Sequence, residues 1–141
     1  MEDVFPKKEL ETAQQFKANE LRSCWFENQN GKMTAHPLPN AAQTAPVRTI
    51  LVADFDKNGT PDLLLAGNDY GVEVETGRAD AGNGVLLLND GKGSFRAAPN
   101  RECGFWAKKD ARKIRLLRMA NNREAVLVAN NGASLQVFRR E

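Results

Sequence analysis

Residues 54–62, D-F-D-K-N-G-T-P-D, place oxygen-bearing side chains at regular intervals. Loop positions one, three, five and nine are Asp54, Asp56, Asn58 and Asp62. Alternation around a tight loop points such side chains toward one centre, and Ca²⁺ prefers carboxylate, amide and backbone carbonyl oxygens. Gly59 supplies the sharp turn and Thr60 offers its backbone carbonyl. The loop therefore predicts a Ca²⁺ site. Mg²⁺ fits less well because it demands stricter octahedral geometry.

A plain surface turn is the alternative interpretation of this segment, because turns rich in Asp, Asn and Gly also form without a metal. A complete EF-hand is not expected. It would need a bidentate Glu at position twelve and a helix on each side, whereas position twelve is Leu65 in an apolar run. The loop is thus expected to use EF-hand chemistry between two β-strands.

A second candidate site lies in the Gly-rich stretch 69–83, where acids and a base occur close together. These residues are Glu73, Glu75, Arg78 and Asp80. They could bind a polar ligand, since binding residues concentrate on long loops. They could equally be an ion-paired or solvated surface loop, which is the interpretation that we favour. In the enzyme alternative, a metal-assisted hydrolase would use Glu73 or Asp80 near the metal.

The segment from Lys108 to Arg118, K-K-D-A-R-K-I-R-L-L-R, is locally basic. A charged strand at a sheet edge explains it, because edge charges also block aggregation. Nucleic-acid binding is an alternative, but the run lacks interleaved aromatic residues and any RNA-binding fingerprint. His36, the one histidine, has no nucleophile pattern around it, and we expect it to be a surface or packing residue.

The elements that would position these residues are mostly short strands. An amphipathic pattern with Leu10, Ala13 and Leu21 on one face predicts a helix over 7–21. Short apolar or alternating runs with Gly and Asn turns predict strands at 23–27, 33–38, 48–53, 63–66, 85–88, 94–97, 114–117, 125–129 and 135–138. This density of strands and turns is typical of an all-β sandwich or propeller.

The chain also repeats weakly. The segment W-F-E-N-Q-N-G-K-M-T-A-H-P resembles L-L-N-D-G-K-G-S-F-R-A-A-P, and L-L-A-G-N resembles L-V-A-N-N. Both offsets are near sixty residues, which suits one four-stranded propeller blade with its connections. We therefore predict an all-β fold of two four-stranded propeller-type blades over residues 23–141. A short helical segment, residues 1–22, precedes them.

Composition excludes several classes of protein. The 141 residues suit one domain, and a net charge of +2 gives no strong attraction to nucleic acid or membranes. No apolar run approaches the length of a membrane span, so no membrane insertion is expected. The N-terminus has no apolar signal-peptide region. Cys24 and Cys103 are either buried free thiols, which we favour, or a disulfide.

These motifs resemble the FG-GAP/VCBS repeat family, the blades of integrin α-type β-propellers. The matching segments are V-A-D-F-D-K-N-G-T-P-D-L-L-L-A-G-N and G-V-L-L-L-N-D-G-K-G-S-F. More narrowly, A-Q-T-A-P-V and E-V-E-T-G-R-A-D-A resemble the C-terminal part of bacterial ASPIC/UnbV-like (cartilage acidic protein-like) repeat proteins.

The resemblance implies that the Ca²⁺ ligands are the side chains of Asp54, Asp56, Asn58 and Asp62 and the carbonyl of Thr60. The second repeat has Leu117, Met119, Asn121 and Ala125 at the corresponding positions, so no second Ca²⁺ is expected. The family is typically secreted or held at the cell surface.

We expect a calcium-stabilised, non-catalytic binding or scaffolding module. Its partner would be a protein or glycan ligand, the remaining blades of a parent propeller, or a second copy of the chain in a homodimer. Two open blades cannot close a ring, and terminal repeats without caps expose apolar faces. The predicted helix over 7–21 is expected to cover one of these faces.

Overall fold

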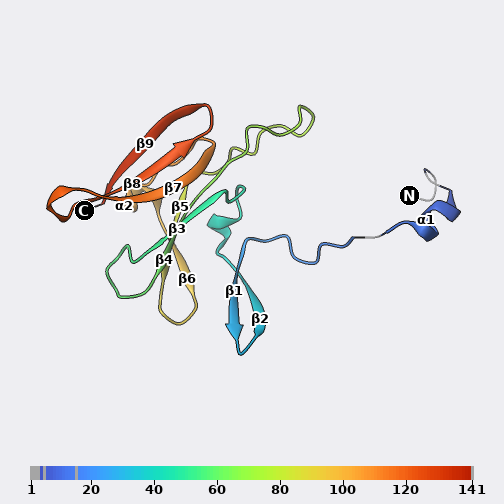
Figure 1. Cartoon of the computed structure of the whole chain (residues 1–141), viewed down its shortest axis with the longest axis horizontal. Helices are drawn as coiled ribbons and strands as arrows, with labels where there is room; N and C mark the ends of the chain where they lie inside the picture. The colour runs from blue at the N-terminus through green and yellow to red at the C-terminus, as the bar shows by residue number, and fades with distance from the viewer. Residues whose placement is uncertain (1–3, 5, 15, 141) are drawn as a thin grey trace.

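The computed structural model describes residues 4, 6–14 and 16–140, and in this part the chain is built from three antiparallel sheets (Figure 1). A hairpin pairs β1 (Cys24–Gln29) with β2 (Lys32–Pro37). Four strands follow in sequential order: β3 (Thr49–Ala53), β4 (Asp62–Ala66), β5 (Val85–Asn89) and β6 (Phe95–Ala98). The last sheet contains β7 (Ala111–Arg118), β8 (Glu124–Asn130) and β9 (Ala133–Arg140).

The prediction of an all-β fold is confirmed, and each of the predicted strands overlaps an observed one. The prediction of two equal four-stranded units is wrong. One sheet has four strands, another has three, and β1–β2 forms a separate hairpin. In the described part of the chain, the sheets do not close into a ring. The repeat offset near sixty residues does not show where one sheet ends, and the hydrogen-bond ladders begin a new sheet at β3 and again at β7.

The predicted helix over 7–21 is also wrong beyond its first turns. The helix α1 spans Lys7–Thr12, and Ala13 is already extended at φ −70° and ψ 132°. No residue of α1 is buried, and Leu21 is 89% exposed. Figure 1 shows this segment extending away from the sheets. An isolated helix this short is marginal in water without a packed face, which explains why it ends early and covers no sheet.

Two apolar cores lie on the two faces of the four-stranded sheet. Successive strand residues point to opposite faces, so Leu64 and Leu65 enter different cores. Leu64 packs in the cluster shared with the three-stranded sheet, together with Phe105, Ile114 and Val128. On the opposite face is a second cluster, which contains Leu38, Ala42, Leu65 and Leu87. The β1–β2 hairpin and the short 3-10 helix η1 (Asn40–Ala42) contribute to it.

One polar contact joins the four-stranded and three-stranded sheets directly. The backbone N–H of Ile114 in β7 donates to the Thr49 hydroxyl oxygen of β3 at 2.9 Å, and both residues are buried. A buried backbone N–H needs a hydrogen-bond acceptor. Because β3 and β7 belong to different sheets, the Thr49 side chain provides the acceptor for Ile114. The contact therefore sets how β3 and β7 lie against each other.

Candidate metal centre

The three predicted aspartates come together in the loop between β3 and β4. Ligand oxygens of Asp54, Asp56 and Asp62 all lie within 4.8 Å of one another. Asp62 is the first residue of β4 and pairs with Ala53 at the end of β3, so the strand ladder brings the two ends of the loop together. The prediction that this spacing would gather the carboxylates is confirmed.

Asp62 is the anchor of this loop. Its side chain is fully buried, and each carboxylate oxygen accepts a backbone hydrogen bond. Oδ2 accepts from the N–H of Phe55 at 2.7 Å, and Oδ1 accepts from the N–H of Asn89 at 2.8 Å. A buried carboxylate is stable only with such partners. Asp62 therefore holds both the start of its own loop and the end of β5.

Asp54 and Asp56 shape the exposed half of the loop. Asp54 accepts from the N–H of Asn58 at 3.1 Å and from the N–H of Gly59 at 2.9 Å. Asp56 accepts from the same Asn58 N–H at 3.2 Å. Gly59 has φ +87°, a conformation that side chains disfavour, and Lys57 has φ +61°. These contacts turn the chain so that its acidic side chains face one centre.

Asn58 connects the loop to the following hairpin. Its amide oxygen accepts from the N–H of Thr60 at 2.8 Å and lies 2.5 Å from the Thr60 hydroxyl oxygen. Its amide nitrogen donates to the carbonyl of Asn89 at 3.1 Å. The Thr60 hydroxyl also lies 2.9 Å from that carbonyl. Asn58 and Thr60, which were both predicted as Ca²⁺ ligands, therefore both contact the backbone carbonyl of Asn89.

Asn89 is the site residue that the sequence analysis missed. It is the first residue of N-D-G-K-G, which predicted only a tight turn. Its backbone N–H donates to Asp62, its carbonyl accepts from Asn58, and its side-chain nitrogen donates to the Pro61 carbonyl at 3.0 Å. No local pattern shows that this turn contacts the acidic loop. The family resemblance of the segment G-V-L-L-L-N-D-G-K-G-S-F predicts a hairpin there. It does not predict the contact with the acidic loop unless the order of the strands in the sheet is known.

The three carboxylates of this loop could hold a metal ion. Three carboxylates, the Asn58 amide oxygen and the Thr60 carbonyl are all hard oxygen ligands. A carboxylate oxygen that already accepts one N–H keeps a second lone pair for a metal. Three negative charges within 4.8 Å repel one another, and a divalent cation would offset that repulsion. The loop is thus suited to bind a cation, with Asp62 as its fixed member.

The second predicted group, in the stretch 69–83, lies on an exposed loop, and its role in ligand binding stays a prediction. Glu73, Glu75, Arg78 and Asp80 are all exposed, and Arg78 lies 5.1 Å over the Tyr70 ring. This loop leaves the far end of β4 and extends away from the sheets (Figure 1). It therefore lies at the opposite end of β4 from the metal loop, and the two acids that a hydrolase would need are not brought to the aspartates.

The basic segment from Lys108 to Arg118 is partly engaged in structural contacts. Lys108 lies 4.7 Å over the Trp106 ring, and Arg118 is 3.7 Å from Glu124. Arg112 binds the buried carboxylate of Asp110 at 2.8 Å. Within β7 the charged side chains are exposed, whereas Ala111 and Ile114 are buried.

The remaining single candidates have structural roles. His36 stacks on Trp25, with ring centroids 4.5 Å apart, and its Nε2 lies 3.0 Å from Glu27. Hydrogen bonds from Gln29 and then from His36 lower the pKa of Glu27. This matches the prediction of a packing histidine. Cys24 and Cys103, for which a disulfide had stayed open, are both free thiols.

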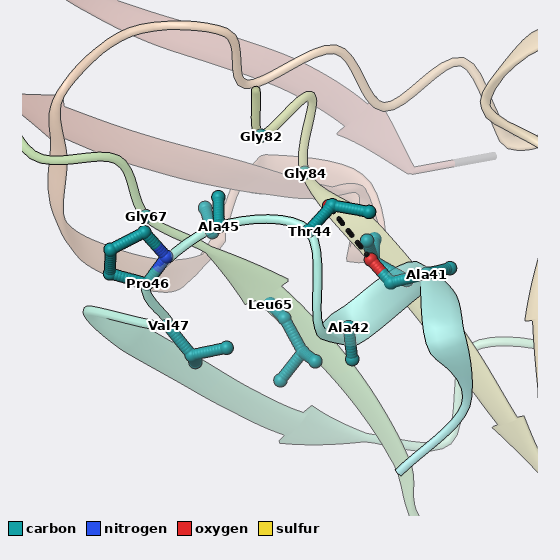
Figure 2. Close-up of a pocket in the computed structure, with 12 residues that line it drawn as sticks. Ala41, Ala42, Thr44, Ala45, Pro46, Val47, Leu65, Gly67, Gly82 and Gly84 are labelled. Atoms are coloured by element: carbon teal, nitrogen blue, oxygen red, sulfur yellow. Dashed lines mark hydrogen bonds between the residues drawn. The ribbon is translucent and has the colours of Figure 1, made fainter. Parts of the chain in front are cut away.

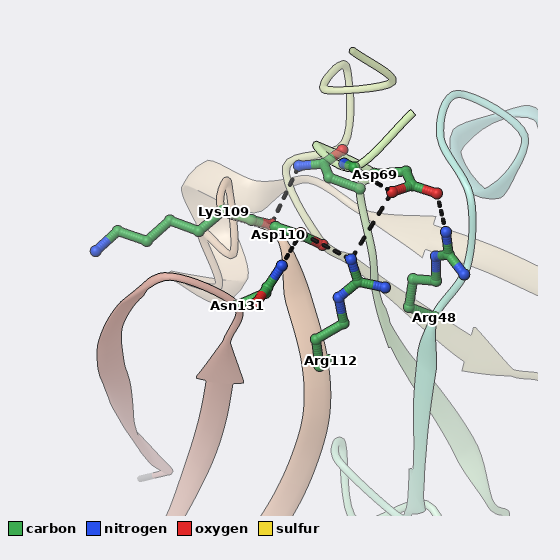
Figure 3. Close-up of polar contacts among 8 residues, drawn as sticks. Arg48, Asp69, Lys109, Asp110, Arg112 and Asn131 are labelled. Carbon is green, nitrogen blue, oxygen red and sulfur yellow. Dashed lines mark hydrogen bonds and ion pairs between the residues drawn. The ribbon is translucent and has the colours of Figure 1, made fainter. Parts of the chain in front are cut away.

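A polar network joins the two larger sheets at the end away from the metal loop (Figure 3). Asp69 forms ion pairs with Arg48 and Arg112, and Arg112 continues to Asp110. Asn131 donates to the same Asp110 carboxylate at 3.1 Å. Burial raises the pKa of Asp110, but the hydrogen bonds from Asn131 and Arg112 outweigh it, so its pKa lies below the usual value. These ion pairs and hydrogen bonds connect the four-stranded sheet to the three-stranded sheet.

The small cavity beside η1 is not a ligand site. Figure 2 shows it lined by small residues, among them Ala41, Ala45 and Gly82. Its volume of about 20 Å³ has room for little more than one water molecule. A Cβ atom on Gly67 would lie 1.8 Å from the Pro46 carbonyl oxygen, so the chain passes too closely here for any side chain.

In the described part of the chain, no helix has the length and apolar character needed to cross a membrane. No protein-family model, no curated protein and no solved structure matches this chain.

Proposed function

We propose that this chain is a calcium-stabilised, non-catalytic binding or scaffolding module with propeller-type sheets, as the resemblance to FG-GAP/VCBS repeats implies. The observation that carries the proposal is the gathering of Asp54, Asp56 and Asp62 within 4.8 Å in a loop between strands. Ca²⁺ would be held by these carboxylates, the Asn58 amide oxygen and the Thr60 carbonyl.

The chemistry that the ion supplies is charge compensation, not activation of a substrate. Asp62 is fully buried, and the loop acids contact backbone groups of the loop and of Asn89. Binding to the folded state alone stabilises a protein by about 2.7 kcal/mol at a hundredfold excess of ligand over Kd. The site therefore strengthens the connection between the loop and the β5–β6 hairpin.

The sheet order supports the propeller part of the proposal. The β3–β6 sheet is a four-stranded antiparallel meander, as one blade would be. The hairpin β1–β2 carries the sequence that resembles β5–β6, and β7–β9 is a meander of three strands. The chain would thus contain the outer hairpin of one blade, a whole blade, and most of a third. Secretion or attachment at a cell surface follows only from the family resemblance.

A calcium titration tests the proposal. Isothermal titration calorimetry of chelator-treated protein should show saturable Ca²⁺ binding, and Ca²⁺ should raise Tm more than Mg²⁺ does at the same concentration. Asp56→Asn should abolish both effects, because Asp56 is exposed and contributes a charge without anchoring the fold. Asp90→Asn, in the adjacent hairpin turn, is the matched control and should respond like the unmodified protein. No heat and no change of Tm up to millimolar Ca²⁺ would disprove the proposal.

A further inference from the structure

The three-stranded sheet of β7, β8 and β9 turns one face away from the rest of the molecule. Ile114 and Phe138 lie on the opposite face, which packs on the four-stranded sheet. Because strand residues alternate between faces, their neighbours along each strand point outward. Among these neighbours Leu117 is 44% exposed, Leu135 is 57% exposed and Val137 is 59% exposed. Single exposed apolar side chains are ordinary, but a group on one sheet face indicates a contact surface.

Basic side chains share this face with the aliphatic ones. In its central row, Arg115 of β7 pairs with Leu127 of β8, which pairs with Val137 of β9. Lys113 stands two residues before Arg115, and Arg139 stands two residues after Val137, so alternation places both on the same face. All three basic residues are exposed. We call this surface the outer face and define it by Lys113, Arg115, Leu117, Leu135, Val137 and Arg139.

The three cations of the outer face have no acidic partner in the described part of the chain. Other basic residues of the same strand are paired, since Arg112 contacts Asp110 and Arg118 contacts Glu124. Glu124 is the one acidic residue within the sequences of the three strands, and alternation places it on the inner side with Val126. The outer face therefore combines positive charge with aliphatic side chains and contains no acid.

This combination suits the surface of a bilayer that contains anionic lipids. Leu117, Leu135 and Val137 have no hydrogen-bond donor or acceptor in their side chains, so they cannot read the sequence of an acidic peptide. Anionic headgroups attract Lys and Arg, and the headgroup–acyl boundary accepts aliphatic side chains. The stems of Lys and Arg can also cover apolar surface while their charged ends reach the headgroups.

We propose that the outer face binds an anionic lipid surface, so that the sheet lies on the bilayer without crossing it. The net charge of +2 predicts no strong attraction to membranes, but the fold gathers three unpaired cations on one face. The proposal is independent of the proposed calcium function. The outer face belongs to the β7–β9 sheet, whereas the aspartate loop connects β3 and β4 in the other sheet.

Co-sedimentation of the full chain with lipid vesicles tests the proposal. Vesicles of equal parts phosphatidylserine and phosphatidylcholine should bind the chain, and vesicles of phosphatidylcholine alone should not. Chelator is present throughout, so that Ca²⁺ cannot bridge protein and lipid. Raising the ionic strength from about 0.1 M to about 1 M shortens the Debye length from about 10 Å to about 3 Å and should release most of the bound chain.

A pair of double variants with equal charge tests whether the outer face is responsible. Lys113→Gln with Arg115→Gln removes two cations from this face. Each cation near an anionic surface contributes about fivefold to binding, so the partition coefficient should fall roughly 25-fold. Lys32→Gln with Arg96→Gln removes the same charge from exposed positions in β2 and β6 and should bind like the unmodified chain. Equal weakening by both double variants would show a general effect of net charge and would overturn the assignment to the outer face.

A second pair of variants tests the aliphatic part of the face. Val137→Glu places an acid in the central row and should abolish vesicle binding, whereas Val74→Glu, at a fully exposed loop position, should not change it. Circular dichroism and thermal unfolding check that all variants fold. An unmodified chain that ignores phosphatidylserine, or that binds both kinds of vesicle equally, would overturn the proposal. Binding to soluble polyglutamate without vesicle binding, if Val137→Glu abolishes it, would assign the outer face to an acidic protein instead of a lipid surface.

Discussion

The backbone N–H of Asn89 donates a hydrogen bond to the buried carboxylate of Asp62 at 2.8 Å. This one contact joins the β3–β4 loop to the β5–β6 hairpin and gives Asp62 a structural role that does not require a metal. The acidic loop therefore has two roles, one structural and one in cation binding, which we assign to different aspartates. Asp62 holds the fold, while Asp56 stands exposed at the position where a cation would be bound.

Substitutions of Asp62 and Asp56 should separate these two functions. Asp62→Asn replaces one acceptor oxygen with an amide NH2 group, which donates and does not accept, so one buried backbone N–H loses its partner. The free energy of unfolding should fall by about 1–3 kcal/mol even in the presence of chelator. Asp56→Asn should leave the unfolding free energy of the chelated protein within about 0.5 kcal/mol and remove the Ca²⁺ response. Urea unfolding with and without Ca²⁺ measures both. Equal effects of the two variants in chelator would contradict this division.

Asn89 should contribute to stability through its side chain as well. Asn89→Ala removes the bond from its side-chain nitrogen to Pro61 and the bond that its side-chain oxygen accepts from Gly91 at 3.0 Å. We expect a loss of about 1–2 kcal/mol in unfolding free energy and a weaker Ca²⁺ affinity, because the hairpin would no longer support the loop.

Asn28 offers a matched control in the β1–β2 hairpin. Its side-chain oxygen accepts from the N–H of Gly31 at 2.9 Å, a turn contact similar to that of Asn89. Asn28→Ala should therefore lower stability by a smaller amount and leave Ca²⁺ affinity unchanged. The Asn89 prediction fails if calorimetry gives the same Ca²⁺ affinity for both variants.

The polar network around Asp110, between the two larger sheets, should make the free energy of unfolding depend on pH in the acid range. The folded pKa of Asp110 lies below its usual value of 3.8, so folding favours the charged form. The stabilisation is then fully present above the unfolded pKa and is lost as pH falls through the folded pKa. Asn131→Ala removes a donor and should raise the folded pKa, which moves acid unfolding to higher pH. Unfolding followed by tryptophan fluorescence against pH measures this. Asn83→Ala, at an exposed loop position, should leave the acid midpoint unchanged.

Gly67 should tolerate no side chain. A Cβ atom there would lie 1.8 Å from the Pro46 carbonyl oxygen and 2.7 Å from the backbone nitrogen of Arg48. These are backbone atoms, which cannot rotate away, so Gly67→Ala should lower Tm strongly or prevent folding. Gly132→Ala tests a turn with no atom within 4 Å of the added carbon but with φ +62°. It should cost only about 1 kcal/mol. Similar Tm values for both variants would contradict this account.

The strands and the acidic loop could be predicted because their signals are local. Short apolar runs between Gly and Asn turns indicate strands, and the ladder that pairs Ala53 with Asp62 follows from the tight loop between them. The helix prediction failed because periodicity shows an apolar stripe but not whether anything packs against it. Leu21 had the right spacing and no partner surface among the described residues.

Contacts between distant segments could not be predicted from the sequence. The Asp62–Asn89 bond spans 27 residues, and the Thr49–Ile114 bond spans 65. Neither residue type nor spacing marks these pairs, because each depends on how the sheets are ordered. The Asp110–Arg112–Asp69 network was missed for the same reason. Its residues appeared in the sequence as a basic run and a separate acidic loop.

The packing of Leu64 and Leu86 against the three-stranded sheet has a consequence during synthesis. The four-stranded sheet is complete at Ala98, but β9, which completes its cover, ends at Arg140, 42 residues later (140 minus 98). At about 5–20 residues per second, a ribosome needs roughly 2–8 s for that stretch. During this interval the apolar face that carries Leu64 and Leu86 lacks the sheet that later covers it.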